Sequence, residues 1–216
     1  FVHPPTVPLH NNNMKMSALD RVLILLTGLL AAYQIVVGID DLSTAPMIAY
    51  TIAFGVLLVA LLLFIILGFD ALESPVVVVV STAIPLSLAL GLVWEHLAAI
   101  RTPYLLFTIL GFVAVVFTRS APLPTENRLP TIVIAIVHGI AGITIFLLPI
   151  IISVQEQARP AFSLVGIGGA LIGIGGLLLS FLRTGKPILP RATTLRVIPG
   201  LLLLMTICFV AGFKYG

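Results

Sequence analysis

Charged residues are scarce in this chain, because only 9% of its 216 residues are Asp, Glu, Lys or Arg. A soluble domain carries roughly 25% of such residues. Hydrophobic residues make up 60% of the sequence, and the mean hydropathy is +1.23. A chain of this length with so few charges cannot cover a surface that faces water. We therefore expect membrane lipid to surround it.

Cysteine is nearly absent, and the short motifs of common enzymes are missing. Cys208 is the one cysteine, which excludes an internal disulfide and a thiolate metal site. The sequence contains no Walker-type glycine loop, no HExxH, no CxxC and no GxSxG. No carboxylate lies in the middle of an apolar run, where an ion-coupled carrier needs one. We expect no catalytic residue and no metal site, and we rank a non-enzymatic function above an enzymatic one.

The basic residues lie in short loops between apolar runs, where they orient helices. The net charge is +3 and the pI is about 9.4, yet no basic patch is interleaved with aromatic residues, so we expect no nucleic-acid binding. Eight Lys and Arg fall on one side of the expected bundle and three on the other. The eight are Lys15, Arg21, Arg119, Arg128, Arg183, Lys186, Arg191 and Arg196, and the three are Arg101, Arg159 and Lys214. This bias predicts a cytoplasmic N-terminus and, with seven spans, an outside C-terminus.

Long apolar runs follow one another along most of the chain, and each spanning helix needs about 20 residues. We expect an all-α, polytopic transmembrane bundle of about seven spans, with an extended polar tail at 1–18 and a single transmembrane domain at 19–216. The spans are expected at 20–38, 46–68, 75–98, 103–118, 130–153, 162–183 and 193–213. The fourth is the shortest, so six spans with one re-entrant segment is the alternative.

A run of small residues in the sixth span is the sharpest pattern. The segment VGIGGALIGIGGLLLS at 165–180 nearly repeats after seven residues and contains a GxxxG pair. Spacings of three and four place five small residues on one helix stripe: Gly166, Gly169, Gly173, Gly176 and Ser180. Glycine lets helices approach closely in lipid. The partner is either another helix of this chain, which we favour, or another subunit, a pigment or a lipid tail.

His138 is the one ionisable side chain well inside an expected span, and such groups are candidates for function. One possibility is a structural histidine that bonds a backbone carbonyl or a threonine such as Thr144 or Thr108. The other is an axial ligand to haem or chlorophyll, since Gly139 and Gly142 would leave room for a flat ring.

Four uncharged polar residues lie in the first two spans: Tyr33, Gln34, Tyr50 and Thr51. They either join helices by hydrogen bonds, which we favour, or line a small polar cavity.

These features rank the functions that the sequence predicts. The first is a non-catalytic membrane subunit that packs within a larger respiratory, photosynthetic or translocation complex. The alternative is a small transporter or channel for a neutral or weakly polar solute, and the third is a haem- or chlorophyll-binding subunit. We expect an integral multi-pass membrane protein, and a prokaryotic plasma membrane is the first choice for its location. The expected partners are membrane lipid and other membrane protein subunits.

Overall fold

The part of the chain that the computed structural model describes consists of helices joined by short links. It comprises residues 15–40, 42–121, 128–183 and 185–216. Most of the tail expected at residues 1–18 lies outside these ranges.

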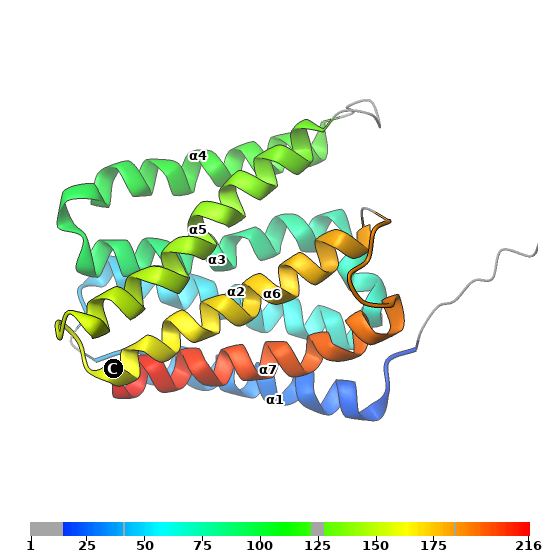
Figure 1. Cartoon of the computed structure of the whole chain (residues 1–216), viewed down its shortest axis with the longest axis horizontal. Coiled ribbons are helices and arrows are strands. Elements are labelled where there is room, and N and C mark those ends of the chain that lie inside the picture. The colour runs from blue at the N-terminus through cyan, green and yellow to red at the C-terminus, as the bar shows by residue number, and fades with distance from the viewer. Residues whose placement is uncertain (1–14, 41, 122–127, 184) are drawn as a thin grey trace, which may run out of the picture.

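Seven helices in the described part are long and apolar enough to cross a membrane (Figure 1). They are α1 (Ala18–Val37), α2 (Thr44–Leu67), α3 (Pro75–His96), α4 (Arg101–Ser120), α5 (Leu129–Val154), α6 (Ser163–Arg183) and α7 (Arg191–Tyr215). Three short 3-10 turns, η1 (Gly68–Glu73), η2 (Ala98–Ile100) and η3 (Pro160–Phe162), lie in the links. The prediction of an all-α chain with seven long apolar helices is confirmed. Each helix end lies within two residues of the expected span end, and the fourth helix has 20 residues.

Local sequence signals set several helix ends. Ser17 and Asp20 form a capping box at the start of α1, in which the Ser17 hydroxyl accepts from the Asp20 amide at 3.2 Å and the Asp20 carboxylate accepts from the Ser17 amide at 2.8 Å. Gly38 ends α1 with a φ of 71°, and Gly68 ends α2 with a φ of 67°. A residue with a Cβ rarely adopts such angles, so glycine terminates both helices.

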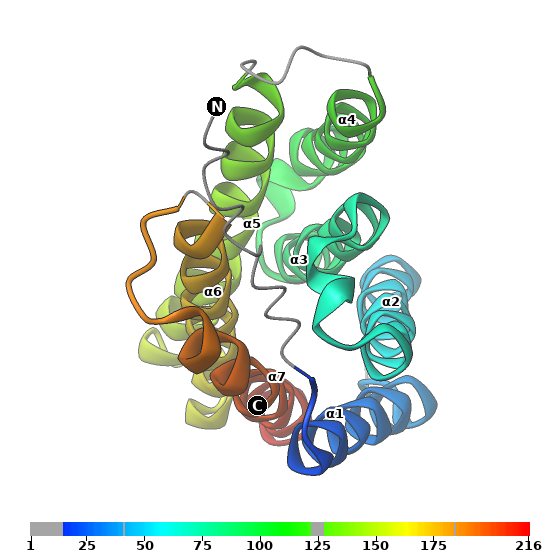
Figure 2. The same ribbon diagram turned by 90° about the vertical axis from the view of Figure 1, so that its right-hand side faces the viewer.

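Six of the helices form a closed ring in the order α1, α2, α3, α5, α6 and α7, and α7 packs back against α1. The seventh, α4, lies outside the ring against α3 and α5 (Figure 2). Successive helices run in opposite directions, so every link lies at one of two ends. We call them the Gly216 end, where the chain finishes, and the Ala18 end, where α1 begins.

Three threonine hydroxyls deep inside the bundle are satisfied within their own helices. Thr27, Thr82 and Thr206 are fully buried, and each donates to the carbonyl four residues earlier at 2.8 Å. Large apolar side chains meanwhile cover much of the outer surface, as in Leu29, Val113 and Ile143. Lipid is the solvent that such a surface requires, and internal pairing is what lipid demands of polar groups.

Candidate functional site

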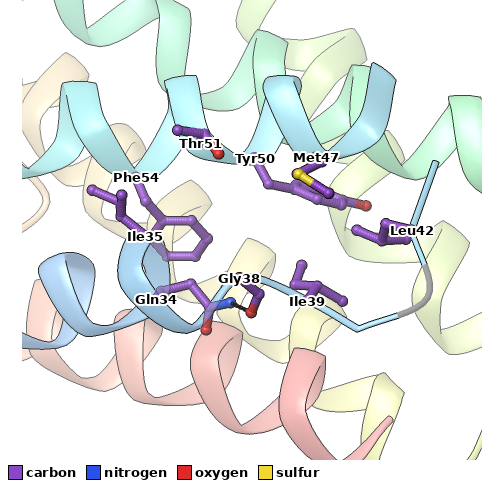
Figure 3. A pocket seen from close by; sticks show the side chains of 9 residues that line it. All are labelled: Gln34, Ile35, Gly38, Ile39, Leu42, Met47, Tyr50, Thr51 and Phe54. Carbon is purple, nitrogen blue, oxygen red and sulfur yellow. Dashed lines mark hydrogen bonds between the residues drawn. The ribbon is translucent and has the colours of Figure 1, made fainter. Parts of the chain in front are cut away.

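A small hollow opens at the Gly216 end, between the end of α1 and the start of α2 (Figure 3). Three of the four polar candidates from the first two spans line it: Gln34, Tyr50 and Thr51. The other lining residues are Ile35, Gly38, Ile39, Leu42, Met47 and Phe54. Its volume of about 20 Å³ is room for one water molecule. Binding sites for small organic molecules measure roughly 300–1,000 Å³, so the hollow in this form holds no such ligand.

Gln34 has a structural task beside the hollow. Its side chain is buried, and its amide nitrogen donates to the Gly38 carbonyl at 2.8 Å (Figure 3). The Gly38 amide in turn donates to the Gln34 carbonyl at 2.9 Å. The pair closes the end of α1, where helix carbonyls would otherwise lack donors.

Tyr50 belongs to an aromatic cluster that fills the ring of helices at the Gly216 end. Its ring centroid lies 4.7 Å from that of Phe213 on α7, and Phe213 lies 6.4 Å from Phe162. The Phe162 ring then meets His96 at 5.2 Å. Gly91 of α3 makes room for Tyr50, because a Cβ at Gly91 would lie 2.5 Å from the Tyr50 ring. The cluster thereby joins α2, α3, α7 and η3 at this end.

Tyr33 lies outside the hollow. It is exposed, and the Lys214 ammonium donates to its hydroxyl at 3.1 Å, joining α1 to α7. The same ammonium lies 5.7 Å from the centre of the Tyr33 ring. Tyr33 therefore joins two helices at their rim.

His138 is half-buried on α5, ten residues into a helix of 26. Its Nδ1 lies 3.1 Å from the Ile134 carbonyl, so Nδ1–H donates and Nε2 keeps a lone pair. A Cβ at Gly139 or at Gly142 would meet no atom within 4 Å. Nε2 is the atom that would ligate a metal, and the role of His138 as an axial ligand stays a prediction. His96 supplies no second ligand nearby, because it ends α3 against Phe162.

The first half of the α6 stripe packs directly on α5. A Cβ at Gly166 would lie 2.5 Å from the Phe146 carbonyl oxygen, and one at Gly169 would lie 2.8 Å from the Ile145 side chain. No larger residue fits at these two positions without moving α5. The partner of this half is therefore a helix of the same chain.

The second half of the stripe has no such partner. Gly173, Gly176 and Ser180 are exposed, and a Cβ at either glycine would meet no atom within 4 Å. Both views show the cause, because α5 and α6 lie together at the Gly216 end and diverge toward the Ala18 end (Figures 1 and 2). The stripe on α6 is thus packed against α5 along its first half and has no packing partner along its second half.

Two further glycines of α6, which the five-residue stripe left out, pack on α7. A Cβ at Gly168 would lie 2.7 Å from the Phe209 ring, and one at Gly175 would lie 3.8 Å from Ile198. The seven-residue repeat in the sequence could have predicted this contact, because it places Gly168 and Gly175 on a second stripe.

Few groups in the described part of the chain are free for chemistry. No group of three His, Cys, Asp or Glu residues there could hold a metal ion. Among the described side chains, Arg119 Nε is the one buried nitrogen or oxygen without a hydrogen-bond partner. No protein-family model, curated protein or solved structure matches the chain.

Proposed function

We propose that the protein is a non-catalytic subunit of a larger membrane complex and that the open half of the α6 stripe receives a helix of a partner. One observation carries this proposal. Gly173 and Gly176 leave bare backbone on the surface of a helix whose other glycines, Gly166 and Gly169, are used for close packing.

Lipid explains why a bare glycine stripe suits another helix. Moving an apolar side chain from lipid to a contact with another helix changes its free energy little, because the two environments are equally apolar. Van der Waals packing and close backbone approach drive association instead, and small residues permit both. Gly173, Gly176 and Ser180 lie at spacings of three and four residues, which keeps them on one face over two turns. This face is shaped for a second backbone.

The polar groups of the described part support a structural task over a catalytic one. Thr27, Thr82 and Thr206 bond to their own helices, Gln34 closes the end of α1, and Tyr33 joins α1 to α7. Each of these groups is already paired within the fold. A subunit that contributes packing and position needs nothing more.

The proposal includes an orientation in the membrane. Eight of the eleven Lys and Arg residues belong to the Ala18 end and three to the Gly216 end. Basic loops stay in the cytoplasm, so we place the Ala18 end inside and the Gly216 end outside. A cysteine scan in intact cells tests this, because a membrane-impermeant thiol reagent should label Gln155→Cys and spare Lys186→Cys.

The complex itself is tested by isolation from native membranes. We expect the affinity-tagged chain, extracted in a mild detergent, to migrate well above its 23.0 kDa mass and to carry further membrane proteins. Gly176→Leu fills the open stripe and should release those proteins. Val59→Leu is the matched control, because Val59 is exposed on α2, away from the stripe. A companion-free monomer from native membranes would contradict the proposal.

A small channel or transporter is the second candidate, because Gln34, Tyr50 and Thr51 meet at one hollow. Its size allows water or a solute of similar size. Stopped-flow measurements of water and glycerol permeability in liposomes test it. Gln34→Ala and His138→Ala should slow the flux if these side chains line a path. Gln155→Ala is the control, since Gln155 is exposed outside the hollow. Permeability equal to that of empty liposomes would remove this candidate.

A further inference from the structure

Exposed cations are concentrated at the Ala18 end of the bundle. Five of them have no side-chain hydrogen bond or ion pair with another described residue: Lys15, Arg21, Arg128, Lys186 and Arg196. Arg21 is the fourth residue of α1 and Arg196 the sixth of α7, so they lie about 5 Å and about 8 Å from the helix starts. These backbone levels lie just inside the edge of the apolar core, from which a long arginine side chain extends outward to the lipid headgroups.

The described carboxylates at this end do not neutralise these cations. Asp20 is buried in the capping box with Ser17, and its oxygen already accepts two hydrogen bonds from that residue. Asp70 is exposed in η1 and bonds none of the five. In the sequence, eight Lys and Arg at this end stand against four carboxylates, Asp20, Asp70, Glu73 and Glu126, so the Ala18 end carries a net positive charge.

At the Gly216 end, most of the basic side chains have partners within the protein. Lys214 bonds the Tyr33 hydroxyl and lies over two tyrosine rings. Arg101 donates from Nε to the Trp94 carbonyl and lies 6.0 Å from the centre of that indole ring. The protein itself satisfies two of the three basic side chains at this end. The ends thus differ in the pairing of their cations as well as in the number of cations.

Arg119 gives the Ala18 end a more specific feature. It lies in the last turn of α4, its side chain is half-buried, and its Nε–H is buried without an acceptor. A buried donor without a partner is costly, and a charged one more so. A guanidinium pairs best with a planar or tetrahedral oxyanion that accepts two parallel hydrogen bonds. A phosphate group at the rim of the bundle would supply the missing acceptor.

We propose that the Ala18 end binds the headgroups of anionic phospholipids, with Arg119 donating to a phosphate oxygen and the five exposed cations attracting further headgroups. Charge complementarity identifies this partner, because basic residues beside a spanning helix attract anionic lipid at the membrane surface. The proposal is independent of any partner subunit. It concerns the surface of the bundle rather than the open half of α6.

The test compares anionic with zwitterionic lipid on the whole protein. Native mass spectrometry counts the lipids retained from mixed micelles that contain equal amounts of phosphatidylglycerol and phosphatidylcholine. We expect the unaltered chain to retain phosphatidylglycerol. The triple variant Arg21→Gln, Arg128→Gln, Arg196→Gln should lower that affinity about fivefold per cation, or about a hundredfold in total. Arg101→Gln, Arg159→Gln, Lys214→Gln removes the same charge at the other end and should leave it unchanged.

A second variant tests Arg119 itself. Arg119→Lys keeps the charge and loses the Nε–H donor, so the affinity for phosphatidylglycerol should fall about fivefold, the worth of one hydrogen bond, while the overall fold persists in circular dichroism. Equal retention of the two lipids by the unaltered protein would overturn the proposal. So would an equal loss in the two triple variants, or full retention by Arg119→Lys. Inorganic phosphate at the lipid concentration should not displace the bound lipid, and displacement would show that the site recognises free phosphate instead.

Discussion

Two glycines of α6 should respond oppositely to one added methyl group. Gly166→Ala places a Cβ 2.5 Å from the Phe146 carbonyl oxygen, whereas Gly173→Ala places it in open space. Ordinary contact begins at about 3.4 Å, so Gly166→Ala must move the α5 backbone away by about 0.9 Å. The change at Gly173 requires no such movement.

The size of the difference follows from two terms. Alanine stabilises a helix by about 1 kcal/mol relative to glycine. Forcing an extra methyl group into a filled contact costs about 2 kcal/mol. Gly166→Ala should therefore destabilise the chain by about 1 kcal/mol, and Gly173→Ala should stabilise it by up to about 1 kcal/mol. The two variants should differ by about 2 kcal/mol.

Unfolding in mixed micelles measures this difference. The chain has one tryptophan, Trp94, whose fluorescence follows unfolding as the fraction of sodium dodecyl sulfate rises. We expect a lower midpoint for Gly166→Ala than for the unaltered chain and an equal or higher one for Gly173→Ala. Equal midpoints for the two variants would refute the packing of α5 on the first half of the stripe.

Three further predictions concern other contacts of the bundle. Tyr104→Phe removes a hydroxyl that donates to Thr144 at 3.1 Å, and a double-mutant cycle with Thr144→Val should give a coupling of about 0.6 kcal/mol. Gly91→Ala should destabilise the bundle by about 1–3 kcal/mol, and Tyr50→Leu in the same chain should recover part of that loss by removing the ring in its way. If His138 ligates a tetrapyrrole, protein from native membranes shows a Soret or chlorin band that disappears in His138→Ala.

Matched controls separate these outcomes from general destabilisation. Thr108→Val also removes a hydroxyl, but that hydroxyl donates to the carbonyl of Tyr104 in its own helix, so it should show no coupling to Thr144→Val. Gly55→Ala meets no atom within 4 Å and should not destabilise. An additive Gly91→Ala, Tyr50→Leu pair would contradict the contact between these residues. The absence of any visible band would remove the tetrapyrrole ligand.

Much of the α6 packing could be predicted from the sequence, because a periodic run of small residues specifies a face. The sequence could not show where that face ends. Besides α6, α5 packs against α3 and α4, and one of these contacts joins Tyr104 to Thr144. Contacts between residues 40 positions apart leave no trace in the local pattern of α6. The division between a filled and an open half is therefore a tertiary result.

The polar residues of α1 show the same limit at the level of single neighbours. Tyr33 and Gln34 are adjacent, so they point about 100° apart around the helix. Gln34 lines the hollow, and Tyr33 bonds Lys214 on α7. A helix that is apolar nearly all round does not specify which of the two turns inward. The choice follows from the positions of α2 and α7.

Site-specific photocrosslinking in native membranes tests the central claim most directly, which is that the open half of α6 contacts a partner helix. A benzophenone amino acid at Leu177, which is exposed on α6 beside the stripe and leaves its glycines in place, should give a crosslinked product of higher mass on irradiation. The same group at Val59, exposed on α2, should give none. No product at Leu177, or an equal product at both positions, would contradict the account.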